Sequence, residues 1–172
     1  MSWTQEIEEL AQRSKLAEQM GGIDKVARQH EFGKLTVRER VEKISDADSF
    51  HEIGKLAGVA RYDDDGNLIE FTPANLVFGT AEIDGRPVMI SGDDFTVRGG
   101  SADASIAGKR AQAEGLAHEL RLPHIRLVDG MGGGGSVKTI ETSGRTYIPG
   151  VAGWEVIVGH LGIAPSVSLA LG

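Results

Sequence analysis

Hydrophobic residues in the first 50 positions recur three, four or seven apart, the spacing of one face of an α-helix. The pattern predicts a helix over residues 4–27 that is interrupted at the double glycine 21–22, because glycine weakens helical structure. A second helix is expected over residues 36–44, since Thr36 and Glu39 have the spacing of a capping box. The rest of this segment is polar, so we expect an arm that packs on another part of the protein.

From residue 54 the pattern becomes that of strands. Strands are expected over residues 55–62, 75–83 and 86–91. The dipeptide Asp84-Gly85 joins the last two, and it is typical of a tight hairpin turn that needs positive φ at both positions. The acidic loop 63–67 resembles half of a calcium-binding loop. Its twelfth position holds Ala74 in place of the expected glutamate, which favours a solvated turn.

The second half of the chain alternates helices and strands. We expect a helix over residues 101–120, a strand over 124–129, a helix over 151–161 and a strand over 165–171. Ser101 is expected to cap the first of these helices and Gly162 to end the second. This alternation is typical of a layered α/β domain. Because the last strand is apolar and needs neighbours, we expect the chain to be a piece of a longer polypeptide.

Composition excludes several classes of function. The 172 residues include 25 acidic and 18 basic side chains, and the net charge of −7 disfavours general nucleic-acid or membrane-surface binding. With no cysteine, the chain has no disulfide, thiolate metal site or cysteine nucleophile, and it suits a reducing cytoplasm. The five histidines show no metal-ligand spacing. No apolar run is long enough to span a bilayer, and the acidic N-terminus lacks a secretion signal's apolar core.

Glycine is over-represented, and its densest run directly follows a predicted strand in residues 129–136 (DGMGGGGS). Ligands bind at the carboxyl ends of strands in α/β sheets, so the run is a candidate site by location. A dinucleotide loop is disfavoured because no helix opens at once, and a P-loop because Lys138-Thr139 comes two residues late. A loop that merely packs close to another backbone stays an alternative. Facing a ligand, glycine backbone can present N–H groups to an oxyanion or leave room for a flat thioester.

Side chains with catalytic chemistry are few. No G-x-S-x-G nucleophile elbow occurs. Asp93 and Asp94 are neighbours in a strand and face opposite ways, which favours a turn or capping role over a carboxylate pair. Lys109 and Arg110 lie beside the apolar seam of their helix. They either extend along the surface to water or meet phosphates near the helix start, and both interpretations stay open.

Several segments form an ordered set of motifs. They are 33–41 (GKLTVRERV), 46–50 (DADSF), 79–88 (GTAEIDGRPV), 94–101 (DFTVRGGS), 129–132 (DGMG) and 162–165 (GIAP). Together they resemble the carboxyltransferase (β) subunit of biotin-dependent acyl-CoA carboxylases of the propionyl-CoA and acetyl-CoA type. Lys109 falls where this family places a helix lysine. Without cysteine, the chain lacks the zinc ribbon of the split bacterial subunit, which favours the single-polypeptide type.

The resemblance implies an α/β fold of the crotonase-like class, built of layered ββα units and preceded by a helical arm. The arm would span residues 1–53, and an acyl-CoA-binding domain, truncated at its C-terminus, residues 54–172. In this family, carboxybiotin donates its carboxyl group to the α-carbon of an acyl-CoA, and backbone amides stabilise the enolate. Biotin would be carried by a biotin carboxylase or biotin carboxyl carrier partner. A cytoplasmic homo-oligomer, typically a hexamer, is implied, with no metal in this chain.

The resemblance also assigns substrate-binding positions. Gly132 and Gly133 would line the acyl pocket, and CoA would be supported by Gly99, Gly100, Ser101 and Lys109. No catalytic residue is assigned, because the family's oxyanion glycines follow the position of Gly172. Gly134 replaces a family arginine, so a catalytically silent binding or assembly subunit is an alternative, as is a biotin-dependent acyl-CoA decarboxylase subunit. Alone, the chain is expected to be inactive.

Overall fold

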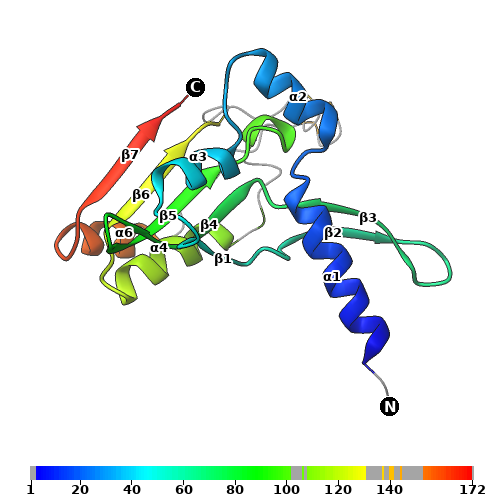
Figure 1. The fold of residues 1–172 in the computed structure, drawn as a ribbon, viewed down its shortest axis with the longest axis horizontal. Coiled ribbons are helices and arrows are strands. Elements are labelled where there is room, and N and C mark those ends of the chain that lie inside the picture. The colour runs from blue at the N-terminus through cyan, green and yellow to red at the C-terminus, as the bar shows by residue number, and fades with distance from the viewer. Residues whose placement is uncertain are drawn as a thin grey trace.

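The computed structural model describes residues 3–101, 106, 108–130, 137, 140–141, 144 and 153–171. A five-stranded sheet lies at its centre, and helices cover both faces of this sheet (Figure 1). The elements are α1 (Thr4–Glu18), α2 (Ile23–Glu31), α3 (Val37–Ile44), β1 (His51–Ile53), β2 (Gly58–Tyr62), β3 (Leu68–Pro73), β4 (Leu76–Ile83), β5 (Arg86–Asp93), the 3-10 turn η1 (Arg98–Gly100), α4 (Lys109–Glu119), β6 (His124–Val128), α6 (Trp154–Leu161) and β7 (Ser166–Ala170).

The sheet has the strand order β1-β4-β5-β6-β7. The first three strands pair antiparallel, whereas β5, β6 and β7 pair parallel. Parallel strands end at the same edge of a sheet, so the segments that follow β5 and β6 are neighbours. A separate ribbon of β2 and β3 extends from the body beside α1 (Figure 1).

The predicted N-terminal helices are confirmed. The double glycine separates α1 from α2, and α3 begins with a complete capping box. The backbone N–H of Thr36 donates to Glu39 Oε2 at 2.7 Å, and the N–H of Glu39 donates to Thr36 Oγ1 at 3.3 Å. Hydrogen bonds from His30 and then from Thr36 lower the pKa of Glu39 to about 2.

The predicted hairpin is also confirmed. Asp84 and Gly85 have φ values of 51° and 70°, and Ile83 is paired with Arg86 across the two-residue turn. The carboxylate of Asp46 accepts hydrogen bonds from the N–H groups of both turn residues. Strands β1 and β3 were absent from the sequence prediction, and the strand expected over residues 55–62 begins only at Gly58.

The core has two parts, one on each face of the sheet. On the α3 face, Val41 packs with Ala81, Val88, Ile90 and Leu127. On the α4 face, the cluster contains Leu76, Phe78, Met89, Ala113 and Ala117. Strand β5 contributes side chains to both parts of the core, because successive side chains of a strand point to opposite faces. This arrangement confirms the layered α/β architecture.

The helix expected over residues 101–120 begins later than predicted. Helix α4 starts at Lys109, and its N-cap is Gly108 in the left-handed conformation at φ 85°. A residue with positive φ cannot continue a right-handed helix. Ser101 is a buried residue in extended conformation after η1, and it does not cap α4, whose N-cap is Gly108.

The remaining predicted elements are confirmed, with β6, α6 and β7 in the expected order. Gly162 is the C-cap of α6, as expected. Within the described ranges, none of the helices combines the length and apolar character needed to cross a bilayer.

Candidate functional site

The backbone after β5 makes an unusual turn at the carboxyl edge of the sheet. Arg98, Gly99 and Gly100 have consecutive φ values of 52°, 64° and 66°. A Cβ added to Gly100 would lie 2.7 Å from the carbonyl oxygen of Asp129. Only glycine permits this close approach of two main chains. The turn of η1 therefore lies directly against the end of β6, where the sequence placed the candidate site.

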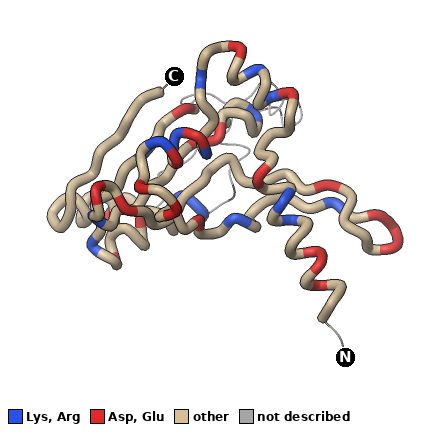
Figure 2. The backbone as a smooth tube through the Cα atoms, in the orientation of Figure 1, with Lys and Arg blue, Asp and Glu red and all other residues tan. Residues whose placement is uncertain are grey.

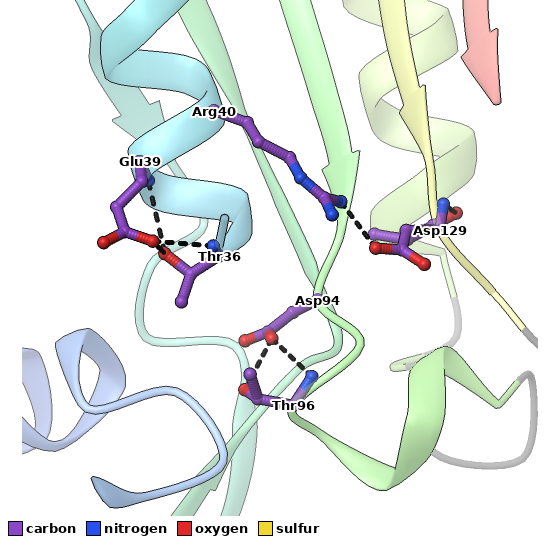
Figure 3. A network of polar contacts seen from close by, with 7 residues as sticks. Thr36, Glu39, Arg40, Asp94, Thr96 and Asp129 are labelled. Carbon is purple, nitrogen blue, oxygen red and sulfur yellow. Dashed lines mark hydrogen bonds and ion pairs between the residues drawn. The ribbon is translucent and has the colours of Figure 1, made fainter. Parts of the chain in front are cut away.

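Four charged residues, here called the edge cluster, hold these two strand ends together. Arg40 Nη1 donates to Asp129 Oδ2 at 2.6 Å (Figure 3), and Arg110 forms an ion pair with Asp93. The two strand ends are also linked directly, because the backbone N–H of Asp129 donates to Asp93 Oδ2 at 3.2 Å. Since Arg40 belongs to α3 and Arg110 to α4, the cluster ties helices from both faces to the same edge.

The edge cluster was not predicted as a unit. Asp129 and Asp93 are buried, whereas the Arg110 side chain is 56% exposed. Arg110 therefore contacts Asp93 with one side of its guanidinium group and leaves the other side to solvent. The sequence signal was the position of Asp129 at the end of one predicted strand and of Asp93 two residues after another.

Asp94 has the turn role that its sequence position predicted. Its Oδ1 accepts hydrogen bonds from the Thr96 N–H at 2.9 Å and from the Thr96 hydroxyl at 2.6 Å (Figure 3). Burial raises the pKa of Asp94, although the bonds from Thr96 oppose that effect. The side chain is 1% exposed, which leaves it no access to a substrate.

Lys109 neither extends to water nor lies open to solvent. The residue is 6% exposed, its ammonium lies 6.0 Å from the centre of the Phe78 ring, and its Cε is near Gly54. Burial lowers the pKa of Lys109 to about 8, partly offset by the negative charge of Glu52 and reinforced by Arg38. Among the described residues, no hydrogen bond to its ammonium is present.

A dehydrated ammonium costs folding free energy unless it is paired. Ionisable groups whose pKa is shifted by burial are concentrated in functional sites. Lys109, one of the residues selected from the sequence, is therefore a candidate for a binding role.

A second polar group, here called the core cluster, has the order of contacts of a hydrolase triad. Ser91 Oγ lies 2.9 Å from His124 Nε2, and His124 Nδ1 lies 3.2 Å from Glu114 Oε2. Arg126 completes the cluster by donating to both oxygens of Glu114. Burial opposes ionisation of Glu114, but the bonds from Arg126 and His124 outweigh it and lower the pKa to about 2.

The core cluster is sealed from substrate. Ser91 is 4% exposed and His124 is fully buried, so the hydroxyl cannot reach an external carbonyl group. The cluster joins β5, β6 and α4, and its role is structural. The sequence showed only that His124 has no metal-ligand spacing with the other histidines, and it did not indicate its hydrogen-bonded partners.

The acidic loop after β2 is a solvated turn, as predicted. The carboxylate of Asp63 accepts bonds from the N–H groups of Asp65 and Asn67. Figure 2 shows this acidic tip at the end of the β2–β3 ribbon, away from the sheet. Among the described residues, no three acidic or histidine side chains converge as metal ligands would.

Of the six residues assigned to substrate binding, four are described. Gly99, Gly100 and Ser101 form one segment at the carboxyl edge, and Lys109 begins α4. Gly132 and Gly133 lie outside the described residues. The run they belong to begins at Gly130, which follows β6 and packs near Gly100.

Comparison with known proteins gives a consistent result. Residues 28–149 match the model of the carboxyl transferase domain. The chain is 32% identical over 132 residues to a propionyl-CoA carboxylase, carboxyltransferase subunit, of Haloferax mediterranei, covering 77% of this chain and 26% of that protein. It is 32% identical over 169 residues to a propionyl-CoA carboxylase beta chain of Cereibacter sphaeroides, and the match covers 96% of this chain and 32% of that protein.

Solved structures agree with the sequence comparison. The transcarboxylase 12S structure with methylmalonyl-coenzyme A bound is 30% identical, with a TM-score of 0.62 over 76% of this chain and 26% of that one. A single-chain, multi-domain long-chain acyl-CoA carboxylase is 26% identical, with a TM-score of 0.66, and the match covers 96% of this chain and 17% of that one. The chain therefore spans about a third or less of these relatives. The crotonase-like fold with an N-terminal helical arm is confirmed.

Proposed function

Because this chain belongs to the carboxyl transferase domain family, we propose that it is the N-terminal, acyl-CoA-binding part of a biotin-dependent carboxyltransferase. The complete protein would move a carboxyl group from carboxybiotin to the α-carbon of an acyl-CoA. The observation that carries this proposal is the bare main chain of Gly99 and Gly100, held against the end of β6 by the edge cluster. The relatives named propionyl-CoA carboxylase and the methylmalonyl-coenzyme A bound to the 12S protein support the substrate class.

The chemistry explains why a site of this kind needs few reactive side chains. The α-carbon of a thioester is weakly acidic, so the difficult species is the enolate. Each preorganised N–H donor at an enolate oxygen is worth about 3–4 kcal/mol by analogy with other oxyanion holes. Biotin supplies the activated carboxyl group when its carrier delivers it, and we assign no described residue to holding biotin.

The residues of this chain would bind and orient the CoA ester. Gly99, Gly100 and Ser101 would support the CoA where their backbone meets the strand ends, with Gly132 and Gly133 lining the acyl pocket. Lys109 would provide the positive charge. With a pKa of about 8 it is mostly protonated at neutral pH, and an anionic group of CoA would compensate the charge that burial leaves dehydrated.

The organisation of the complete protein follows from the same proposal. Residues 1–53 would act as a helical arm, and residues 54–172 would begin the acyl-CoA-binding domain. The partners would be a biotin carboxylase or biotin carboxyl carrier subunit and further copies of the chain. A hexamer is proposed by analogy with the hexamer assembly of the 12S protein. The cytoplasmic location expected from the cysteine-free sequence stays a prediction.

The proposal is tested with the full-length protein. Calorimetric titration with propionyl-CoA and acetyl-CoA measures binding, and transfer of labelled carboxyl from a carboxylated biotin carrier to acyl-CoA measures activity. We expect both. If neither acyl-CoA binds at millimolar concentration, the proposal is wrong.

A second candidate is a silent homologue that binds acyl-CoA or partners without transferring carboxyl groups. The feature in its favour is Gly134, where the resemblance to the family leads us to expect an arginine. Acyl-CoA binding without any transfer would support this candidate over the first.

A decarboxylase subunit is the third reading, because the chain is 30% identical over 143 residues to the methylmalonyl-CoA decarboxylase subunit alpha of Veillonella parvula. Transfer of the carboxyl group from methylmalonyl-CoA to a biotin carrier, with propionyl-CoA as the other product and at a higher rate than transfer in the opposite direction, would favour it.

A further inference from the structure

The junction between α1 and α2 lies against the loop that carries Gly99 and Gly100. The backbone N–H of Gly21 donates to Thr96 Oγ1 at 2.9 Å. A Cβ added to Gly21 would lie 2.0 Å from the carbonyl oxygen of Thr96, so no other residue fits there without displacing one segment. The arm and the loop are therefore in main-chain contact, 75 residues apart in sequence.

The hydroxyl of Thr96 is fixed from both sides. It accepts the bond from Gly21 and donates its own proton to Asp94 Oδ1 at 2.6 Å. Thr96 and Asp94 are both buried. A hydroxyl that donates to a carboxylate is a better acceptor for the next donor, because hydrogen bonds in a chain polarise one another. The three groups thus form one continuous chain from the arm to the end of β5.

The loop that runs from Asp94 to Ser101 has a further anchor in Asn75. Asn75 closes it at both ends: its carbonyl accepts from the Asp94 N–H at 3.0 Å, and its side-chain amide donates to the Ser101 carbonyl at 2.7 Å. Between these ends lies the left-handed run that includes Arg98, a residue type that rarely adopts positive φ. Such strain persists only where the surroundings hold it.

We propose that Thr96 is a positioning residue through which docking of the N-terminal arm sets the conformation of the Arg98–Gly100 turn and hence the affinity for acyl-CoA. The second part rests on the proposed function, whereas the first does not. The arm would then act on the site through Thr96, a buried residue.

The experiment uses full-length protein and two independent readouts. Hydrogen exchange of the Gly100 and Ser101 amides, measured without ligand, reports the turn, because these groups are hydrogen-bonded to Val97 and Arg98. The KM for propionyl-CoA and the kcat of carboxyl transfer report the site. Thr96→Val removes the hydroxyl and keeps the shape, and Thr96→Ser restores the hydroxyl.

We expect Thr96→Val to speed exchange of these two amides at least tenfold and to raise KM at least fivefold, with kcat within twofold. Thr96→Ser should restore both values. Gly21→Ala should behave as Thr96→Val. Gly115→Ala is the control, because a Cβ at Gly115 meets nothing within 4 Å and its φ is not positive.

Two results would overturn the inference: exchange and KM unchanged in Thr96→Val, or faster exchange with unchanged KM. If the wild-type protein neither binds nor carboxylates an acyl-CoA, the proposed function fails, and the exchange of Thr96→Val against Thr96→Ser still decides whether the arm sets the turn.

Discussion

The edge cluster and the core cluster both contain carboxylate–arginine ion pairs, but we assign the first to the binding site and the second to the stability of the fold. Each joins at least one helix to strands β5 and β6, and the core cluster also contains Ser91 and His124. In the core cluster Ser91 and His124 are buried and the Arg126 side chain is 17% exposed, whereas in the edge cluster the Arg110 side chain is 56% exposed and the neighbouring backbone is bare glycine. Resemblance to a catalytic triad is therefore a poorer guide to function here than position at the carboxyl edge of parallel strands.

The largest expected effect comes from breaking the buried ion pair of the edge cluster. Asp129→Asn leaves the Arg40 guanidinium, 10% exposed in its side chain, without a charged partner. Removing one member of a buried pair costs about 3–5 kcal/mol. We expect a loss of this size in the free energy of unfolding, measured by denaturant titration, together with at least tenfold weaker binding of propionyl-CoA. Unchanged affinity in the folded variant would separate the edge cluster from the site.

The corresponding change in the core cluster is Glu114→Gln. We expect it to cost about 2–3 kcal/mol of stability, because Arg126 and His124 lose a charged acceptor. The folded variant should bind propionyl-CoA with wild-type affinity, which distinguishes a structural cluster from a functional one. A folded variant with weakened binding would contradict that distinction.

The shifted pKa of Glu114 also predicts how the stability of the protein depends on pH. The pKa of Glu114 is lowered from 4.5 to about 2, so its contribution to stability is complete above pH 4.5 and is lost as the pH falls towards 2. Denaturant titrations over this range should show a steeper loss of stability in the wild type than in Glu114→Gln. Equal slopes would contradict the assignment.

Substitution of Lys109 should stabilise the protein, whereas substitutions in the two clusters should destabilise it. Replacing its buried ammonium by an apolar side chain of similar length, in Lys109→Met, should stabilise the protein by about 1–3 kcal/mol at pH 7 while weakening CoA binding. Because its pKa is about 8 when folded and 10.5 when unfolded, the gain should shrink as the pH rises from 8 to 10.5. Lys25→Met, at an exposed position, is the control and should change neither quantity. A destabilised Lys109→Met variant would contradict the assignment.

The smallest effect is expected at the outer ion pair of the edge cluster. Arg110 is more than half exposed, so Arg110→Gln should cost less than about 1 kcal/mol of stability. Thermal unfolding at low and high salt would measure it, and the difference from wild type should decrease at high salt because exposed charges are screened. A loss as large as that of Asp129→Asn would mean that the pair is buried in the complete protein.

Local signals in the sequence predicted most elements. Thr36 with Glu39, and Asp84 with Gly85, indicate a helix start and a turn by chemistry that acts over a few residues. The start of α4 was mispredicted because the apolar spacing continues through Gly108, and its left-handed conformation leaves no periodic signal. Strands β1 and β3 were missed because they are short or mostly exposed and depend on their pairing partners.

The candidate site was predictable in location but not in construction. The ends of β5 and β6 and the glycines there could be found from the sequence. The pairing of Arg40 with Asp129 spans 89 residues and joins a helix to a strand, so only the folded chain brings them together. The bond between Gly21 and Thr96 is of the same kind, since it spans 75 residues.

The affinity of full-length Gly100→Ala for propionyl-CoA, measured by calorimetry beside Gly85→Ala, tests the central claim most directly. Both glycines have positive φ, 66° and 70°, so backbone strain is matched, but only Gly100 lies against the end of β6. We predict at least tenfold weaker binding for Gly100→Ala and a change below twofold for Gly85→Ala. Wild-type affinity in a folded Gly100→Ala protein would contradict the claim that this backbone supports the CoA ester.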